Sequence, residues 1–204
     1  GVHGGRCVRT TARIGGAAVR APQSLATLVP PIRFLNSAGH LTSLFLGDSF
    51  TRVTALHASG KDLYFAANVG DGRGESASIW RRSDIGTLEK IAGNGQRFDS
   101  PQIYTGAPKA LNALLPLGQI KAMQVDGAGN ILFSDSAHTH LYDAKTATLS
   151  TRLRDVPANG FLWTGPESFL YSSGRQVRFQ SGAGSVPIAG GGSGPDRGDG
   201  GLAV

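Results

Sequence analysis

The chain has 204 residues, of which 40% are hydrophobic and only 17% charged, so it can form a core and is unlike a disordered chain. Its 30 glycines, about twice the usual usage, argue against a helical bundle or coiled coil, because glycine costs a helix interior about 1 kcal/mol per site. The net charge of +6 lies almost entirely in residues 1–47, which hold five arginines and no acidic residue. Residues 1–31 are predicted to be a basic N-terminal segment of the kind that often lacks regular structure. Cys7 is the single cysteine, which excludes an intramolecular disulfide.

Short apolar strands separated by glycine-rich turns follow in chain order. Residues 32–37 and 41–47 are predicted as the last two strands of an incomplete unit. In strand 52–59, regular alternation places Val53 and Ala55 on one face. Three complete four-stranded units are predicted: residues 52–59, 63–68, 78–83 and 88–93; residues 120–126, 131–136, 140–145 and 149–155; and residues 160–164, 169–173, 176–180 and 185–190.

A repeat of about 48 residues relates these units. Ile-Ala-Gly at residues 91–93 recurs 97 residues later at residues 188–190, and both copies precede glycine-rich sequence. The unit between them should end near residues 153–155, where this ending is degenerate. Four short antiparallel strands in 40–50 residues is the period of a propeller blade. The sequence therefore predicts an all-β fold, a partial β-propeller of about three and a half four-stranded blades over residues 32–204, incomplete at the C-terminus.

Aromatic side chains on the predicted strands are expected to fill the layers between blades, because they bury the largest apolar areas. The residues concerned are Tyr64, Phe65, Phe133, Phe161, Trp163, Phe169 and Tyr171.

One segment resembles a known family. Residues 125–135 read Val-Asp-Gly-Ala-Gly-Asn-Ile-Leu-Phe-Ser-Asp, which is similar to the NHL-repeat pattern of a strand, Asp-x-x-Gly-Asn, a second apolar strand and Asp. Residues 106–116 resemble the linker between NHL blades, and residues 197–203 resemble the start of the same linker. The resemblance covers about residues 32–204. It implies a fragment of a larger NHL-repeat β-propeller protein whose remaining blades belong to the same chain.

The recurring polar residues have a structural interpretation. Asp126, Gly129 and Asn130 are predicted to build a hairpin turn, because aspartate accepts backbone N–H bonds within its own turn while glycine and asparagine tolerate positive φ. We expect no binding role for them.

The densest group of potential metal ligands is formed by Asp135, His138, His140 and Asp143. Two histidines at i and i+2 on a strand lie on one face, about 6.5–7 Å apart, which is compatible with shared ligation. The group falls in a predicted loop between strands, where polar residues are expected anyway, so we expect no metal cofactor and little loss of stability on replacing the histidines. Residues 191–197 imitate a calcium-binding nonapeptide, but such sites form between stacked copies.

The leading functional prediction is a non-enzymatic propeller scaffold or binding module, part of a larger exported or cell-surface protein. It would bind a protein or glycan partner through its blade loops, with residues 94–109 and 69–76 as the expected contributors. The alternative, which the family resemblance implies, is a propeller lyase or hydrolase with a metal in the central channel. RNA binding would require a basic face, yet residues 48–204 carry only +1. No apolar run is long enough to cross a membrane.

Closing a ring is how a propeller covers its blade faces. We expect this chain to form an open arc that self-associates through its end faces, and the natural protein to carry at least two more units.

Overall fold

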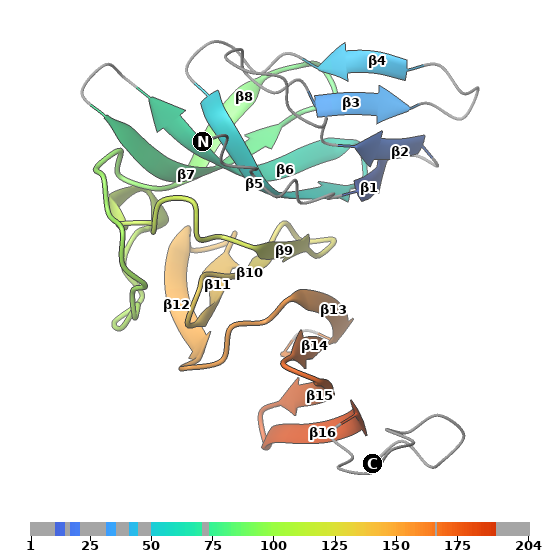
Figure 1. Cartoon of the computed structure of the whole chain (residues 1–204), viewed down its shortest axis with the longest axis vertical. Helices are drawn as coiled ribbons and strands as arrows, with labels where there is room; N and C mark the ends of the chain where they lie inside the picture. Colours follow the sequence, from blue (N-terminus) through green and yellow to red (C-terminus); the bar gives the residue numbers. More distant parts are fainter. Residues whose placement is uncertain are drawn as a thin grey trace, which may run out of the picture.

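Sixteen short strands form four antiparallel sheets in the computed structural model (Figure 1). The structure describes residues 50–70, 74–165 and 167–190, together with four short strands nearer the N-terminus. Those four strands make sheet 1, in the order β1 (Thr11–Ile14), β2 (Ala17–Arg20), β3 (Ile32–Leu35) and β4 (Leu41–Leu44). Cys7 and the segments 191–197 and 197–203, on which the sequence analysis made predictions, lie outside the described residues.

The other three sheets are meanders, because each strand pairs with the next along the chain. Sheet 2 contains β5 (Phe50–Ser59), β6 (Asp62–Gly70), β7 (Glu75–Arg82) and β8 (Leu88–Ala92). Sheet 3 contains β9 (Ala122–Val125), β10 (Ile131–Ser134), β11 (Thr139–Asp143) and β12 (Thr148–Leu153). Sheet 4 contains β13 (Gly160–Gly165), β14 (Ser168–Ser173), β15 (Gln176–Ser181) and β16 (Gly184–Gly190).

The three complete units predicted from the sequence are confirmed as sheets 2, 3 and 4. The predicted half unit is present as β3 and β4. It is completed by β1 and β2, which come from the basic segment 1–31, so the structure has four sheets where the sequence indicated three and a half. The one helical element among the described residues is η1 (Ala110–Asn112), a short 3₁₀ turn. In that part of the chain no helix has the length and apolar character to span a membrane.

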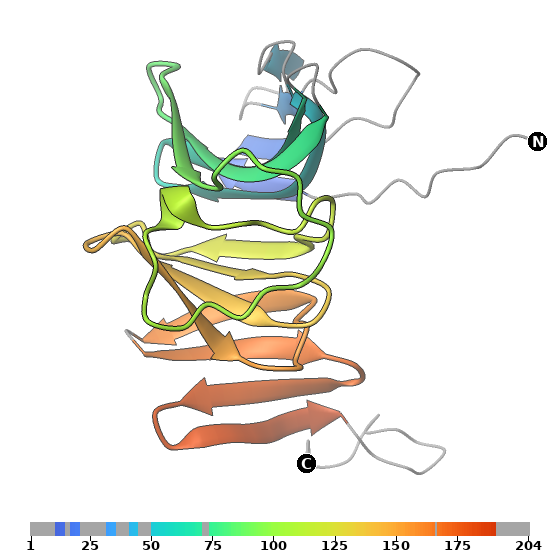
Figure 2. The same cartoon turned by 90° about the vertical axis from the view of Figure 1, so that its left-hand side faces the viewer.

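The sheets stack face to face along the line of their first strands (Figure 2). Strand β5 contacts both β1 and β9, and β9 also contacts β13. Sheets 1 and 4 lie at opposite ends of the stack (Figure 1). Sheets 2 and 3 therefore meet a neighbour on each face, sheets 1 and 4 meet one neighbour each, and the first strands line the inner side of the arrangement.

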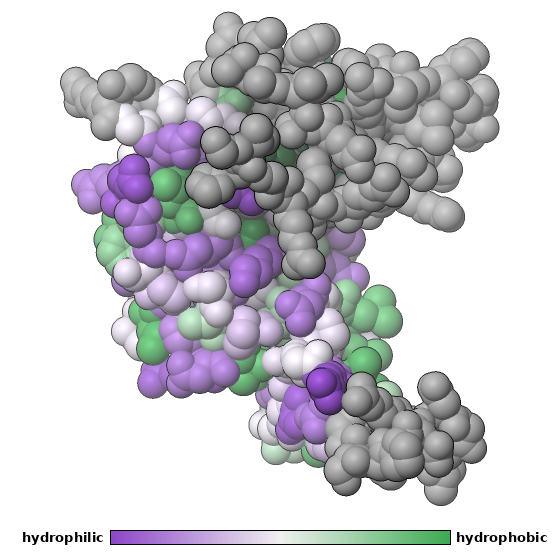
Figure 3. Space-filling model, viewed as in Figure 1, coloured by the Kyte–Doolittle hydropathy of each residue, from purple (hydrophilic) through white to green (hydrophobic). Residues whose placement is uncertain are grey.

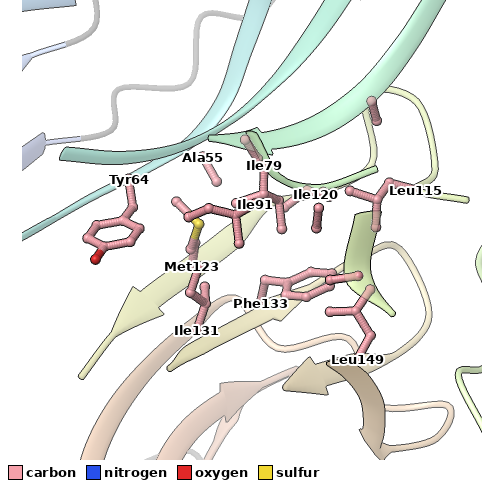
Figure 4. Close-up of a cluster of buried hydrophobic side chains, with 14 of the residues drawn as sticks. Ala55, Tyr64, Ile79, Ile91, Leu115, Ile120, Met123, Ile131, Phe133 and Leu149 are labelled. Atoms are coloured by element: carbon pink, nitrogen blue, oxygen red, sulfur yellow. The ribbon is translucent and has the colours of Figure 1, made fainter. Parts of the chain in front are cut away.

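A buried apolar layer fills each of the three interfaces between sheets. The central layer, between sheets 2 and 3, is the largest, and Figure 4 shows side chains from both sheets meeting there. Of the predicted aromatic residues, Tyr64 and Phe133 lie in the central layer and Phe65 lies between sheets 1 and 2. The layer between sheets 3 and 4 contains the rest: Phe161, Trp163, Phe169 and Tyr171. The prediction that aromatic side chains fill the layers is confirmed.

Strand β5 departs from the regular alternation predicted for it. A bulge lies between Val53 and Ala55, where the pairing with β6 shifts by one residue. Val53 packs into the layer between sheets 1 and 2, whereas Ala55 belongs to the central layer. The expectation that these two residues share a face was wrong, because an extra residue in one strand reverses the facing of everything beyond it.

The repeated Ile-Ala-Gly ending marks the place where the outer strand of a unit must turn away. Gly93 has a φ of 104° and Gly190 a φ of 78°, which is the region that favours glycine. A Cβ on Gly93 would lie 2.6 Å from the carbonyl oxygen of Ala77, and one on Gly190 would collide with the carbonyl oxygen of Arg175. In the degenerate middle unit Asp155 adopts a φ of 56°, a conformation that aspartate tolerates better than most residues.

The outward face of sheet 4 carries an apolar row. Leu162 pairs with Leu170, Leu170 with Phe179, and Phe179 with Val186, so the four side chains lie on one face across all four strands. Leu162 is 54% exposed and Val186 53%. Hydrophobic side chains also reach the surface beside β13 in the space-filling view (Figure 3). In sheets 2 and 3 the corresponding face is buried by the next sheet. None of the described residues covers this face of sheet 4.

Candidate functional site

The turn between β9 and β10 is built from the three predicted turn residues. Oδ1 of Asp126 accepts the backbone N–H groups of Ala128 at 2.8 Å and Asn130 at 2.9 Å, and its Oδ2 accepts the Asn130 side-chain amide at 2.8 Å. Gly129 has a φ of 85°. The side-chain oxygen of Asn130 also accepts the N–H of Ala144, so the β9–β10 and β11–β12 turns are held together.

This turn forms one wall of a hollow between sheets 2 and 3. The hollow has a volume of about 670 Å³. Four turns surround it, because β5–β6, β7–β8, β9–β10 and β11–β12 all reverse direction at the same end of the two sheets. The charged residues in its lining are Lys61, Asp62, Arg81, Asp84, Glu89 and Asp126.

Arg81 occupies the centre of the sheet 2 wall. Strand pairing places Tyr64, Arg81 and Glu89 in one row across β6, β7 and β8. Asp62 accepts from Nε of Arg81 at 2.8 Å and lies 2.7 Å from its Nη2, while Glu89 lies 3.6 Å from its Nη1. The hydrogen bond to Asp62 holds the pKa of Arg81 above its ordinary value. The guanidinium is therefore fixed between two carboxylates.

Two tyrosines form the floor of the hollow. The Tyr64 ring belongs to the central layer and its side chain is 7% exposed, while its hydroxyl points away from that layer (Figure 4). A Cβ on Gly129 would lie 3.7 Å from this hydroxyl oxygen, which puts it beside the β9–β10 turn. None of the described residues accepts a hydrogen bond from it. Tyr142 comes from β11 in the facing sheet and packs against the same layer.

The pKa values of both tyrosines are raised. Burial is the main cause for Tyr64, where Arg81 opposes the shift and Asp62, Glu89 and Asp126 add to it. Burial is also the main cause for Tyr142, followed by Glu89. Burial is therefore the shared cause of the two shifts, and nearby carboxylates add to it.

Of the predicted weak metal-ligand candidates, Asp135, His138 and His140 lie together, whereas Asp143 lies at the other end of β11. Asp135 and His140 are fully buried, and Nε2 of His140 lies 3.1 Å from Oδ2 of Asp135. The Tyr104 N–H donates to Oγ1 of Thr151, so that hydroxyl is available to donate to Nδ1 of His140, 3.2 Å away. Both ring nitrogens of His140 are therefore engaged within the protein.

His138 and Asp143, the other two candidate ligands, each contact a backbone N–H group. Nδ1 of His138 accepts the N–H of Asp155 at 3.0 Å, and its side chain is 9% exposed. Asp143 lies at the other end of β11, where it accepts the N–H of Thr146 in an exposed turn. Within the described ranges no three histidine, cysteine or acidic side chains are grouped so that they could hold a metal ion. The expectation that both histidines are loop residues was wrong, because His140 lies within β11 and both side chains are buried.

That connector, residues 94–109, was expected to contribute to a binding surface. Part of it instead extends the outer edge of sheet 3, since the N–H of Leu149 donates to Pro108 and that of Thr151 to Tyr104. The Tyr104 ring lies edge-on to His140 at 4.9 Å between centroids. Half of the other expected contributor, residues 69–76, belongs to strands β6 and β7, and its tip lies outside the described residues.

Comparison with known proteins identifies the fold. No family model and no curated protein matches this chain, whereas 28 chains of solved structures do. One is the extracellular domain of a two-component system from B. thetaiotaomicron, with a TM-score of 0.50, 9% identity, 92% of this chain covered and 22% of that chain. Another is a protein described as a gluconolactonase, with a TM-score of 0.53, 14% identity, 84% of this chain covered and 59% of that one.

These relatives are β-propellers, and the chain spans less than two thirds of either. Four stacked four-stranded meanders whose first strands line the inner side make this chain a partial β-propeller, as the 48-residue repeat predicted.

Proposed function

We propose that this chain is a non-enzymatic binding module of the NHL type within a larger propeller protein, and that it recognises a macromolecular partner through the hollow between sheets 2 and 3. The observation that carries the proposal is the hollow itself. Four turns from two sheets surround about 670 Å³ that holds ion-paired side chains and two tyrosines. Concave sites with a few convergent polar groups are where proteins bind ligands.

The NHL assignment is supported by the way the Asp-x-x-Gly-Asn segment is used. Asp126 and Asn130 close the β9–β10 turn and tie it to the next turn of the same sheet. Ser59 donates to the Asp126 carbonyl oxygen at 3.2 Å, which ties it to sheet 2 as well. The residues that resemble the NHL pattern thus form one wall of the hollow through hydrogen bonds to the backbone.

The module's partner is proposed to be a protein or a glycan. The test is binding of the full chain to printed arrays of peptides and of oligosaccharides, repeated with Glu89→Ala and Tyr142→Ala. Binding should be lost in both variants. Arg97→Ala is the matched control, because Arg97 is an exposed, ion-paired residue of the connector that does not line the hollow. Binding that all three variants retain would refute the proposed site.

A further inference from the structure

We propose that the hollow holds the cationic side chain of a lysine or arginine presented by a protein partner. This inference rests on the proposed function and names the chemistry of the ligand. Four carboxylates and two cationic side chains line the hollow, which leaves two negative charges in excess. Residues 48–204, which form the hollow and the sheets around it, are nearly neutral with a net charge of +1, so the hollow concentrates negative charge.

The carboxylates differ in how closely they are paired with the two cationic side chains. Asp62 is 21% exposed and bound tightly by Arg81. Glu89 is 62% exposed and contacts Arg81 only at 3.6 Å, and Asp84 is 48% exposed and lies 3.8 Å from Lys61. Long, exposed ion pairs contribute little, so Glu89 and Asp84 remain available to a further cation. Arg81 contacts both Asp62 and Glu89, and Asp62 is the closer partner.

The two tyrosines add polar groups that a ligand can use. Tyr64 is largely buried, but its hydroxyl lines the hollow, is open to solvent and has no hydrogen-bond partner among the described residues. A phenol oxygen accepts a hydrogen bond from an ammonium or guanidinium group, and the faces of tyrosine rings attract cations. Tyr64 and Tyr142 therefore suit the same class of ligand as the excess carboxylates.

The excess negative charge of the hollow favours a cationic partner over a neutral oligosaccharide or an acidic peptide. A neutral oligosaccharide would leave the two excess charges uncompensated, and an acidic peptide would be repelled by them. The long methylene stem of lysine or arginine would lie along Ile91 and the tyrosine rings while its charged end reaches Glu89.

The experiment is a titration of the ¹⁵N-labelled full chain followed by amide chemical shifts. Four probes are used: the capped peptide Gly-Gly-Lys-Gly-Gly, the same peptide with glutamate in place of lysine, butylammonium and cellohexaose. The lysine peptide should shift the amides of Gly60, Ala128 and Gly129, and its binding should weaken as salt is added.

Variants identify the groups that bind. Glu89→Gln should weaken binding of the lysine peptide about tenfold, as expected for loss of a hydrogen bond to a charged group. Tyr142→Phe tests the second hydroxyl and should weaken binding by a smaller factor. Asp99→Asn, an exposed carboxylate of the connector, should leave it unchanged. Unchanged binding in Glu89→Gln would overturn the inference.

Other outcomes separate this inference from the proposed function. If cellohexaose or the glutamate peptide shifts the same amides and the lysine peptide does not, the cation site is refuted, whereas the proposed binding module is not. Butylammonium binding as tightly as the lysine peptide would identify a site for free amines and also overturn the inference. If no probe shifts these amides, the cation site is refuted, and array binding that survives Glu89→Ala would then refute the binding module too.

Discussion

The buried carboxylate of Asp135 should be worth far more to stability than its counterpart at the other end of β11. Asp135 accepts the N–H groups of Ala137 at 2.8 Å and His138 at 2.7 Å, and it also pairs with Nε2 of His140. Asp143 likewise accepts a backbone N–H, from Thr146, but in an exposed turn. The two aspartates therefore make the same type of turn contact, and they differ in burial and in the histidine.

Replacing Asp135 with alanine leaves three donors without their acceptor, and the ring nitrogen of His140 has 0% exposure. An unsatisfied buried donor costs about 1–3 kcal/mol, and breaking a buried pair costs about 3–5 kcal/mol. We expect Asp135→Ala to lower the free energy of unfolding by about 3–5 kcal/mol. Asp143→Ala should lower it by about 1 kcal/mol or less, because water replaces the carboxylate at the Thr146 N–H.

Urea unfolding followed by tryptophan fluorescence and circular dichroism measures both variants, with the free energy taken by linear extrapolation. The slope should be unchanged, so that the midpoints can be compared directly. A loss in Asp135→Ala no greater than that in Asp143→Ala would show that the Asp135–His140 pair does not stabilise the fold, and the account of these residues as structural would fail.

Three further predictions concern other parts of the fold. Burial lowers the pKa of His57 below its ordinary 6.5. Its neutral form therefore contributes stability that is fully present above pH 6.5 and is lost as the pH falls through the lower pKa of the folded state. The urea midpoint should drop between pH 7.5 and 5.5, and it should drop by less in His57→Gln. Gly93→Ala should destabilise strongly, by about 2–4 kcal/mol, because of positive φ and the Ala77 carbonyl; a thermal melt within 2 °C of wild type would contradict this. The chain should self-associate through the outward face of sheet 4, and the double variant Leu162→Lys/Val186→Lys should shift its sedimentation towards the monomer; unchanged sedimentation would show that association, if any, uses another surface.

The strands of sheets 2 to 4 could be predicted because the information for each is local. In β10, for example, residues 131–133 are apolar, as is typical of a strand buried on both faces. The turn at Asp126 is likewise specified by residues within five positions of one another. The repeated Ile-Ala-Gly ending revealed the period, because the outer strand needs a glycine where it leaves the sheet.

The candidate site could not be predicted in this way. Tyr64, Arg81 and Glu89 form a row only once the register of three strands is set, and Tyr142 reaches them from the next sheet. The same reason applies to His138 and His140. Their sequence neighbourhood is that of a surface loop, but residues distant along the chain contact them. The Tyr104 ring packs against His140, and the Asp155 N–H donates to His138.

The sequence by itself determined the all-β class, the number of strands per unit and the turns, because these depend on side-chain periodicity and on backbone preferences within a few residues. Tertiary structure alone decided which charges meet and which are removed from water. Coulomb attraction and desolvation depend on distance and burial between groups that are distant in sequence. Asp135 and Asp143 show this most directly, because, of two similar turn aspartates, eight positions apart, only Asp135 is fully buried and paired with a histidine.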